Sequence, residues 1–322
     1  MLQRSRIALR AAAAAAALLA IAAIVSMALL DPAAHRARIE AAASRALGME
    51  VSVNGPMALR WRPRAYLVLR DVRARKHGAD VAVVKEVVVG LKLASLLGGE
   101  PKLHSVALHD GELSLARLAD GRFNFLKDPV PGQARPARAL PDLSFEQVFI
   151  RYSDPRLDHP IEARACRGEL HNLHTAGGER RLLAVLSFDA VASCADVRSG
   201  TIVLAGVDTR AHADAGVIEL QPFSTRLFGV QSSGRVRADF SAAAPAYQVQ
   251  QTLRQFPVEQ MLKAMSVREL ASGRIDLGVE LALQGRTLKE LEQSVQGTVV
   301  LRGQGLTYHG GNIDEQFERF ES

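Results

Sequence analysis

The chain has 322 residues, of which 48% are hydrophobic and 23% charged, and its formal net charge is +6. A chain of this length and composition can bury a substantial core, which excludes a disordered or low-complexity protein. Aromatic residues make up only 5% of the chain and no base-stacking motif accompanies the basic residues, so we expect no nucleic-acid partner.

The first predicted element is a membrane anchor. Residues 11–30 are an uncharged run, long enough as a helix to cross a hydrocarbon layer of about 30 Å, and Asp31-Pro32 ends it. Its insertion depends on the larger apolar side chains, since the rest of the run is mostly alanine; those assigned to the anchor are Leu18, Leu19, Ile21, Ile24, Val25, Leu29 and Leu30. A cleaved signal peptide is the alternative, although the apolar part of such a peptide is usually only about 7–15 residues long.

Charges on the two sides of this run nearly balance. Arginines 4, 6 and 10 precede the run and arginines 36, 38 and 45 follow it. A short tail with three arginines favours a cytoplasmic N-terminus, because a long downstream domain is translocated largely regardless of charge. We therefore expect an inner-membrane protein with a periplasmic body.

The body is predicted to be mainly β. A helix over Ala33–Leu47 is expected to end at Gly48, and an alternating pattern then begins with two strands, Met49–Val53 and Met57–Trp61. Further strands are expected at Tyr66–Val72, Val81–Leu93, Leu103–Leu108, Glu112–Leu118, Phe145–Tyr152, Leu182–Ala190, Thr201–Val207, Val217–Leu220, Arg235–Phe240, Tyr247–Leu253 and Thr298–Arg302.

The clearest alternation is in Arg274–Gln284. One face of this strand is predicted to be apolar and to be a candidate lipid-contact surface; it consists of Ile275, Leu277, Val279, Leu281 and Leu283. The opposite face is mainly polar, which is typical of an antiparallel sheet with one solvated side. The pattern is compatible with a closed core and with an apolar surface that meets a ligand.

Helices and long loops are few. Short helices are expected at Leu91–Leu97, Val258–Leu270 and Thr287–Val295, the last with a Thr-led start and Glu290 three residues later. Pro129–Pro141 contains four prolines and is interpreted as a long loop that divides the body.

Few residues are candidates for chemistry. Cys166 and Cys194 could form a disulfide in an oxidising compartment, or they could be two buried free thiols. Cys166, His171 and His174 have a metal-like spacing but lack a fourth ligand, so we expect no metal site. No nucleophile elbow, zinc-protease helix or phosphate-binding loop is present, so we expect neither an enzyme nor a bound cofactor.

The order of several short motifs resembles the AsmA family. These motifs are Asp31-Pro32, Val51–Pro56, Trp61–Arg64, Leu67–Val72, Leu113–Arg117, Asp120–Phe125, Val148–Asp154, Ser272–Leu277, Gln296–Thr298 and Gly305–Asp314. The resemblance is weakest at residues 163–234, and the chain ends at Ser322, soon after a segment that the family usually extends. It implies an anchor over residues 1–31, an α+β region over 32–128, a loop over 129–141 and a β body over 142–322.

The resemblance also implies a function. AsmA-like proteins resemble lipid-transfer proteins in which a curved, largely antiparallel sheet forms a groove that shields acyl chains in the periplasm. The expected partners are therefore phospholipid membranes and factors of outer-membrane assembly or lipid transport. The basic surface would suit anionic headgroups, and a merely solvated arginine-rich surface is equally compatible with it. A scaffold that modulates outer-membrane protein assembly without carrying lipid is the second expectation.

Overall fold

The computed structural model describes residues 35–61, 65–91, 103–128, 138–175, 182–200, 202–227, 229–264 and 271–308. The predicted anchor at residues 11–30 lies outside these ranges, as does the predicted helix at 91–97 apart from Leu91. Among the described residues, none of the helices combines the length and apolarity that a membrane span requires.

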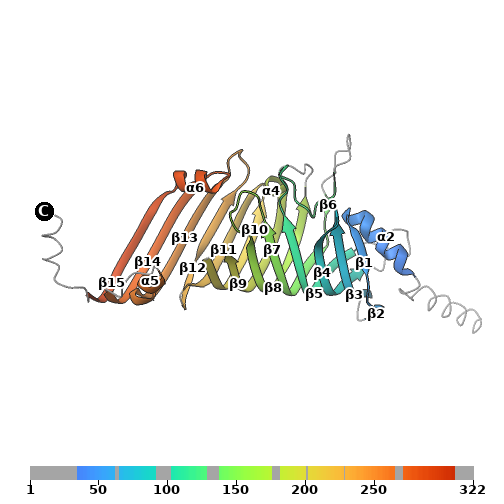
Figure 1. Cartoon of the computed structure of the whole chain (residues 1–322), viewed down its shortest axis with the longest axis horizontal. Helices are drawn as coiled ribbons and strands as arrows, with labels where there is room; N and C mark the ends of the chain where they lie inside the picture. Colours follow the sequence, from blue (N-terminus) through green and yellow to red (C-terminus); the bar gives the residue numbers. More distant parts are fainter. Residues whose placement is uncertain are drawn as a thin grey trace, which may run out of the picture.

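Strands make up most of the described chain (Figure 1). The strands are β1 (Glu50–Val53), β2 (Met57–Trp61), β3 (Ala65–Lys76), β4 (Ala79–Leu91), β5 (Leu103–Ala116), β6 (Arg138–Ala139), β7 (Asp142–Ser153), β8 (Ile161–Thr175), β9 (Leu186–Ser199), β10 (Ile202–Asp214), β11 (Val217–Leu227), β12 (Val230–Asp239), β13 (Ala246–Pro257), β14 (Ala271–Gln284) and β15 (Gln296–Tyr308). The helices are α2 (Arg36–Leu47), α4 (Leu182–Val185), α5 (Val258–Ala264) and α6 (Leu288–Ser294).

All fifteen strands belong to one open sheet. Its main path runs β1-β3-β4-β5-β7-β8-β9-β10-β11-β12-β13-β14-β15, and β2 and β6 pair beside this path with β3 and β8. Every pair is antiparallel except β5 with β7, which are parallel. The expectation of a mainly β, largely antiparallel fold with few helices is confirmed. Strands before and after the proline-rich stretch pair directly, so both sides of it share one sheet.

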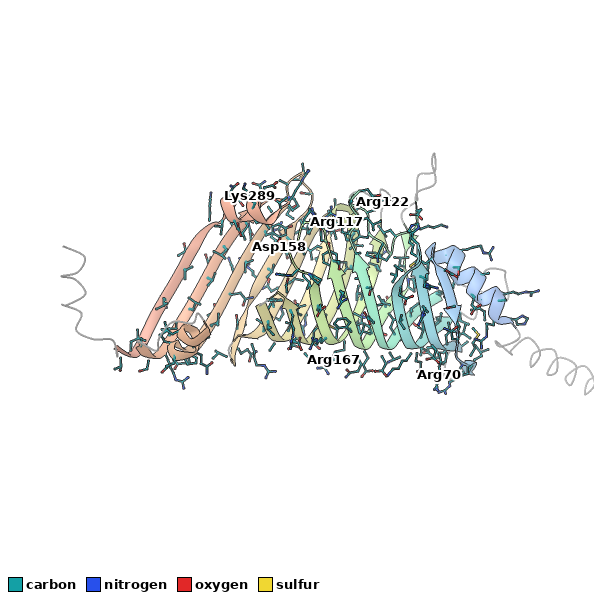
Figure 2. The ribbon with its side chains drawn as sticks, in the orientation of Figure 1. Arg70, Arg117, Arg122, Asp158, Arg167 and Lys289 are labelled. Atoms are coloured by element: carbon teal, nitrogen blue, oxygen red, sulfur yellow. A yellow bond between two sulfur atoms is a disulfide. The ribbon has the colours of Figure 1, made fainter. Side chains whose placement is uncertain are left out.

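The sheet is bent along its length. Asp71, Asp110, Gln147, Ala165 and Gly206 interrupt β3, β5, β7, β8 and β10 with positive φ angles that break the alternation of the strand. We call these positions bulges; those of β7, β8 and β10 also shift the register with a neighbouring strand. Arg70 and Arg167 lie near the middle of their strands, yet Figure 2 places both at the lower margin of the molecule. The strands therefore turn at the level of the bulges, and the sheet folds lengthwise.

Helix α2 covers the N-terminal edge of the sheet. It ends at Gly48 in the left-handed conformation, as predicted from the glycine. Its Glu40 carboxylate accepts a hydrogen bond of 2.7 Å from the Val53 backbone N–H, and its Ser44 hydroxyl accepts one of 2.9 Å from the Val51 N–H. Arg36 donates to the Val53 carbonyl. Side chains of α2 thus bind the backbone groups that a further strand would otherwise bind.

Several predicted boundaries were wrong. Leu103–Leu108 and Glu112–Leu118 were expected as two strands but form one, β5, because a bulge at Asp110 interrupts the alternation without ending the strand. Strand β8 was not predicted. Residues 182–185 form a helical turn before β9, where a strand was expected. The predicted proline-rich loop contains the two-residue strand β6.

Candidate functional site: the apolar face of the sheet

Cross-strand pairs define an apolar row across almost the whole sheet. Residues that face each other in neighbouring strands point to the same side of the sheet, so successive pairs can be followed from strand to strand. The row crosses β2, β3, β4, β5 and β7 to β14, and it consists of Leu59, Leu67, Val89, Val106, Leu143, Leu170, Ala190, Ala211, Leu220, Val236, Val249 and Leu281. No polar residue interrupts it.

A second row runs parallel to the first on the same face. It contains Met57, Leu69, Val87, Leu108, Phe145, Gly168, Ala192, Thr209, Phe223, Gly234, Gln251, Val279 and Val299. Gln251 is one of its two polar members, and its carbonyl oxygen accepts a 2.7 Å hydrogen bond from the buried Ser232 hydroxyl. The amide is thus partly satisfied, which lowers the cost of a polar group on this face.

The bulges place the apolar face on the inside of the bend. In β3, Leu67 and Leu69 before the bulge and Val72 after it belong to or pack against one apolar cluster, while Arg70 and Asp71 between them are exposed. Two successive residues therefore occupy the outer face at the bulge. A longer outer path is what a convex face requires.

The opposite face is polar from β8 to β14, whereas at β2 to β5 it also carries apolar side chains such as Val68 and Val88. The row next to the apolar one, but on the outer side, contains His171, Asp189, His212, Glu219, Arg237, Gln248 and Ala282. His212 Nδ1 lies 2.7 Å from Asp189 Oδ1, and this hydrogen bond raises the pKa of the imidazole. Hydrogen bonds with Glu169 and Asp142 likewise raise the pKa of His171. From β8 to β14, this face is therefore suited to contact with water.

The candidate residues of β14 lie on the apolar face, with one difference among them. Leu277, Val279, Leu281 and Leu283 are partly exposed there. Ile275 is only 2% exposed, because it packs with Leu253, Phe256 and Val258 beneath α5. Sequence alternation identified the face but not the helix that covers one end of it.

A charged cluster lies at the end of β7. The Asp154 carboxylate accepts hydrogen bonds of 2.9 and 2.6 Å from Arg156 and one of 3.0 Å from the Tyr152 hydroxyl, and Arg117 Nη1 lies 3.8 Å away. The Arg156 bonds hold the pKa of Asp154 at about 2. Burial raises the pKa of Tyr247, whose phenol lies in electrostatic range of Arg156. Tyr247 belongs to β13, so the segment after β7 that carries Arg156 lies within electrostatic range of β13.

Cys166 and Cys194 form a disulfide between β8 and β9. Cys166 pairs with Val148 of β7, and Cys194 pairs with Val207 of β10, so the disulfide joins a row across four strands in which Val148, Cys166 and Val207 are buried. The Cys166 thiolate is therefore not available beside His171 and His174. The described residues contain no group of three metal-ligating side chains.

Hollows are present on the polar side of the sheet. One of about 870 Å³ is lined by side chains of the outer face, including Arg235, Gln250, Glu280 and Thr298. Because it lies on the outer face, we do not identify it with the candidate site. The candidate site is the extended inner face itself.

The fold and this face define a class of protein in which an open β-sheet bends around an apolar surface on one of its sides. In a comparison with protein families, the family described as AsmA family matches residues 4–163 of the chain. The chain belongs to the AsmA family, as its ordered motifs suggested. No curated protein matches the chain.

Proposed function

We propose that this chain is a non-enzymatic, membrane-anchored protein of the periplasm that shields phospholipid acyl chains along its apolar face and so supports outer-membrane biogenesis. The observation that carries the proposal is the uninterrupted row of twelve apolar residues from Leu59 to Leu281. Membership of the AsmA family is consistent with such a role.

The dimensions of the row suit this task. Strands lie about 4.8 Å apart, so twelve successive strands give an apolar path of about 50 Å. An acyl chain in water is disfavoured by about 0.8 kcal/mol for each exposed CH₂ group. A continuous apolar wall lowers that barrier without any covalent step, and an open side lets the headgroup stay in water.

The location rests on three features. Residues 11–30 would be the anchor, with the arginine-rich tail in the cytoplasm and the body in the periplasm. The Cys166–Cys194 disulfide supports an oxidising compartment, because cytosolic proteins rarely keep one. Arginines on the polar face would favour anionic headgroups at a membrane surface.

Lipid binding is tested with two matched variants of β14. Leu281→Asp places a carboxylate in the apolar row, whereas Ala282→Asp places it on the exposed outer face one residue further. The detergent-extracted wild type and Ala282→Asp are expected to retain phospholipid detected by mass spectrometry, and Leu281→Asp to retain at least about fivefold less. Absence of lipid from the wild type, or equal loss in both variants, would contradict the proposal.

A scaffold for outer-membrane protein assembly is the second candidate. It is favoured by the exposed apolar residues of β15, which suit a protein partner. Crosslinking that captures a stable protein partner, together with wild-type protein free of lipid, would select this function over lipid shielding.

A further inference from the structure

The C-terminal edge of the described sheet is an exposed strand. Strand β15 is the last in the sheet, and its side chains from 296 to 303 are all exposed. Val299 is 61% exposed, Val300 45% and Leu301 53%, so apolar groups project from both of its faces. Residues 296–304 contain one charge, that of Arg302, and no proline. Edge strands normally avoid this combination because it invites another strand to pair.

This edge is also regular. Residues 296–304 pair with β14 without interruption, from Gln296 opposite Ala282 to Gln304 opposite Arg274. The first register shift comes beyond Gln304, and Gly305 has a positive φ. A nine-residue stretch therefore keeps the straight backbone that a further strand needs.

The sequence of this stretch is nearly symmetric about Val300. If two copies of β15 pair in antiparallel fashion around that residue, the facing residues are Gln296 with Gln304, Gly297 with Gly303, Thr298 with Arg302, Val299 with Leu301, and Val300 with itself. Glycine faces glycine, aliphatic faces aliphatic and no like charges meet. Like charges directly opposite would oppose such pairing, whereas matched aliphatic pairs favour it.

We propose that two copies of this chain associate through β15, with a two-fold axis at Val300 perpendicular to the sheet. An isologous contact of this kind requires a self-complementary surface, which the near-symmetric stretch provides. The axis keeps the same face of both sheets on one side. Val299 and Leu301, which lie on the face of Val279 and Leu277, then continue the apolar face from one copy into the other.

The proposal does not depend on lipid binding, so it can be tested by mass alone. The full chain is extracted in detergent, and its protein mass is measured by sedimentation with the detergent density-matched. We expect a two-chain mass for the wild type. Val300→Lys and Val300→Glu each place like charges on the axis and should weaken the dimer at least about tenfold. Because Val300 is exposed and faces Gly278, circular dichroism of both variants should match the wild type.

Two further results are specific to this register. Mixing the Lys and Glu variants should restore a two-chain mass, since the opposite charges then meet on the axis. The only two cysteines of the chain form the disulfide, so Val300→Cys introduces a single free thiol. Val300→Cys should crosslink two chains on mild oxidation. Thr298→Cys should not, because the two copies of residue 298 lie apart along the paired strands. A single-chain wild type, a dimer that survives Val300→Lys, or a mixture that stays monomeric would overturn the proposal.

Discussion

The two ends of the sheet differ in how the unpaired backbone groups of the edge strand are treated: one is covered and the other is open. At the N-terminal edge, β1 is only four residues long and Glu40, Ser44 and Arg36 of α2 bind its outward backbone groups. At the C-terminal edge, β15 has thirteen residues, with exposed aliphatic side chains on both faces. Unpaired strand edges recruit other strands, and natural sheets usually protect them.

This difference shows what each end is suited to do. At the helix-covered edge, which follows the predicted anchor in sequence, the outward backbone groups of β1 already bind side chains of α2. The open edge lies at the far end of the apolar face, where an added strand would lengthen that face. Stability should therefore depend on side chains at the first edge and association on side chains at the second.

The largest expected effect concerns the disulfide that lies between the two edges. It joins β8 to β9, so each half of the sheet contains one edge. Replacing both Cys166 and Cys194 by alanine should lower the free energy of unfolding by about 3 kcal/mol, since the crosslink closes a loop of 28 residues. Urea unfolding measures the loss. An unchanged midpoint would show that the halves are held together by pairing alone.

The next effect compares the edges directly. Glu40→Ala removes the acceptor of the Val53 N–H, and Val53 is 2% exposed, so about 2 kcal/mol of stability should be lost. Glu40→Gln keeps an accepting oxygen and should cost less than half as much. At the other edge, Thr298→Ala should change the free energy of unfolding by no more than about 0.5 kcal/mol. Equal losses at both edges would contradict the comparison.

Acid should destabilise the charged cluster at the end of β7. The pKa of Asp154 is about 2, below the value near 3.9 of an unfolded aspartate. A lowered pKa gives stability that is present above pH 3.9 and lost as pH falls through 2, here up to about 2 kcal/mol. Asp154→Asn should remove this loss between pH 4 and pH 2. If the free energy of unfolding of that variant still fell as steeply between pH 4 and pH 2, the effect would belong to other carboxylates.

The smallest effect should come from the histidines of the outer face. The pKa values of His171 and His212 are raised by their carboxylate partners. A raised pKa gives stability that is present below about pH 6.5 and lost as pH rises through the folded-state values. The melting temperature should therefore fall slightly between pH 6 and pH 9, and His212→Gln should flatten this change. A rise over the same range would show that the sign is wrong.

The sequence predicted strands well where their alternation was uninterrupted. Arg274–Gln284 of β14 contains no bulge, and its apolar face was identified residue by residue. Strand β8 has positive φ angles at Ala165 and Asn172, so its inward residues change parity twice and no period of two is visible. Its inward residues are Ala163, Cys166, Gly168 and Leu170, of which only the last is a large aliphatic residue, so the hydrophobic signal of this strand is weak.

Long-range features could not be predicted at all. The twelve-residue row depends on the register between neighbouring strands, which single-strand patterns do not contain. The burial of Ile275 depends on α5 folding over it, and the edge bonds of α2 depend on how the helix docks. Local periodicity determined which residues point inward, whereas pairing determined that they form one continuous surface.

The central claim is that acyl chains lie along the inner row, and site-specific photocrosslinking tests it most directly. A photoreactive amino acid is placed in turn at Leu143, Val236 and Leu281 of the row, and at Ser144, Arg237 and Ala282 on the outer face. In cells, phospholipid adducts are expected at all three inner positions, in clear excess over the outer ones. Adducts at both faces alike, or at neither, would contradict the account.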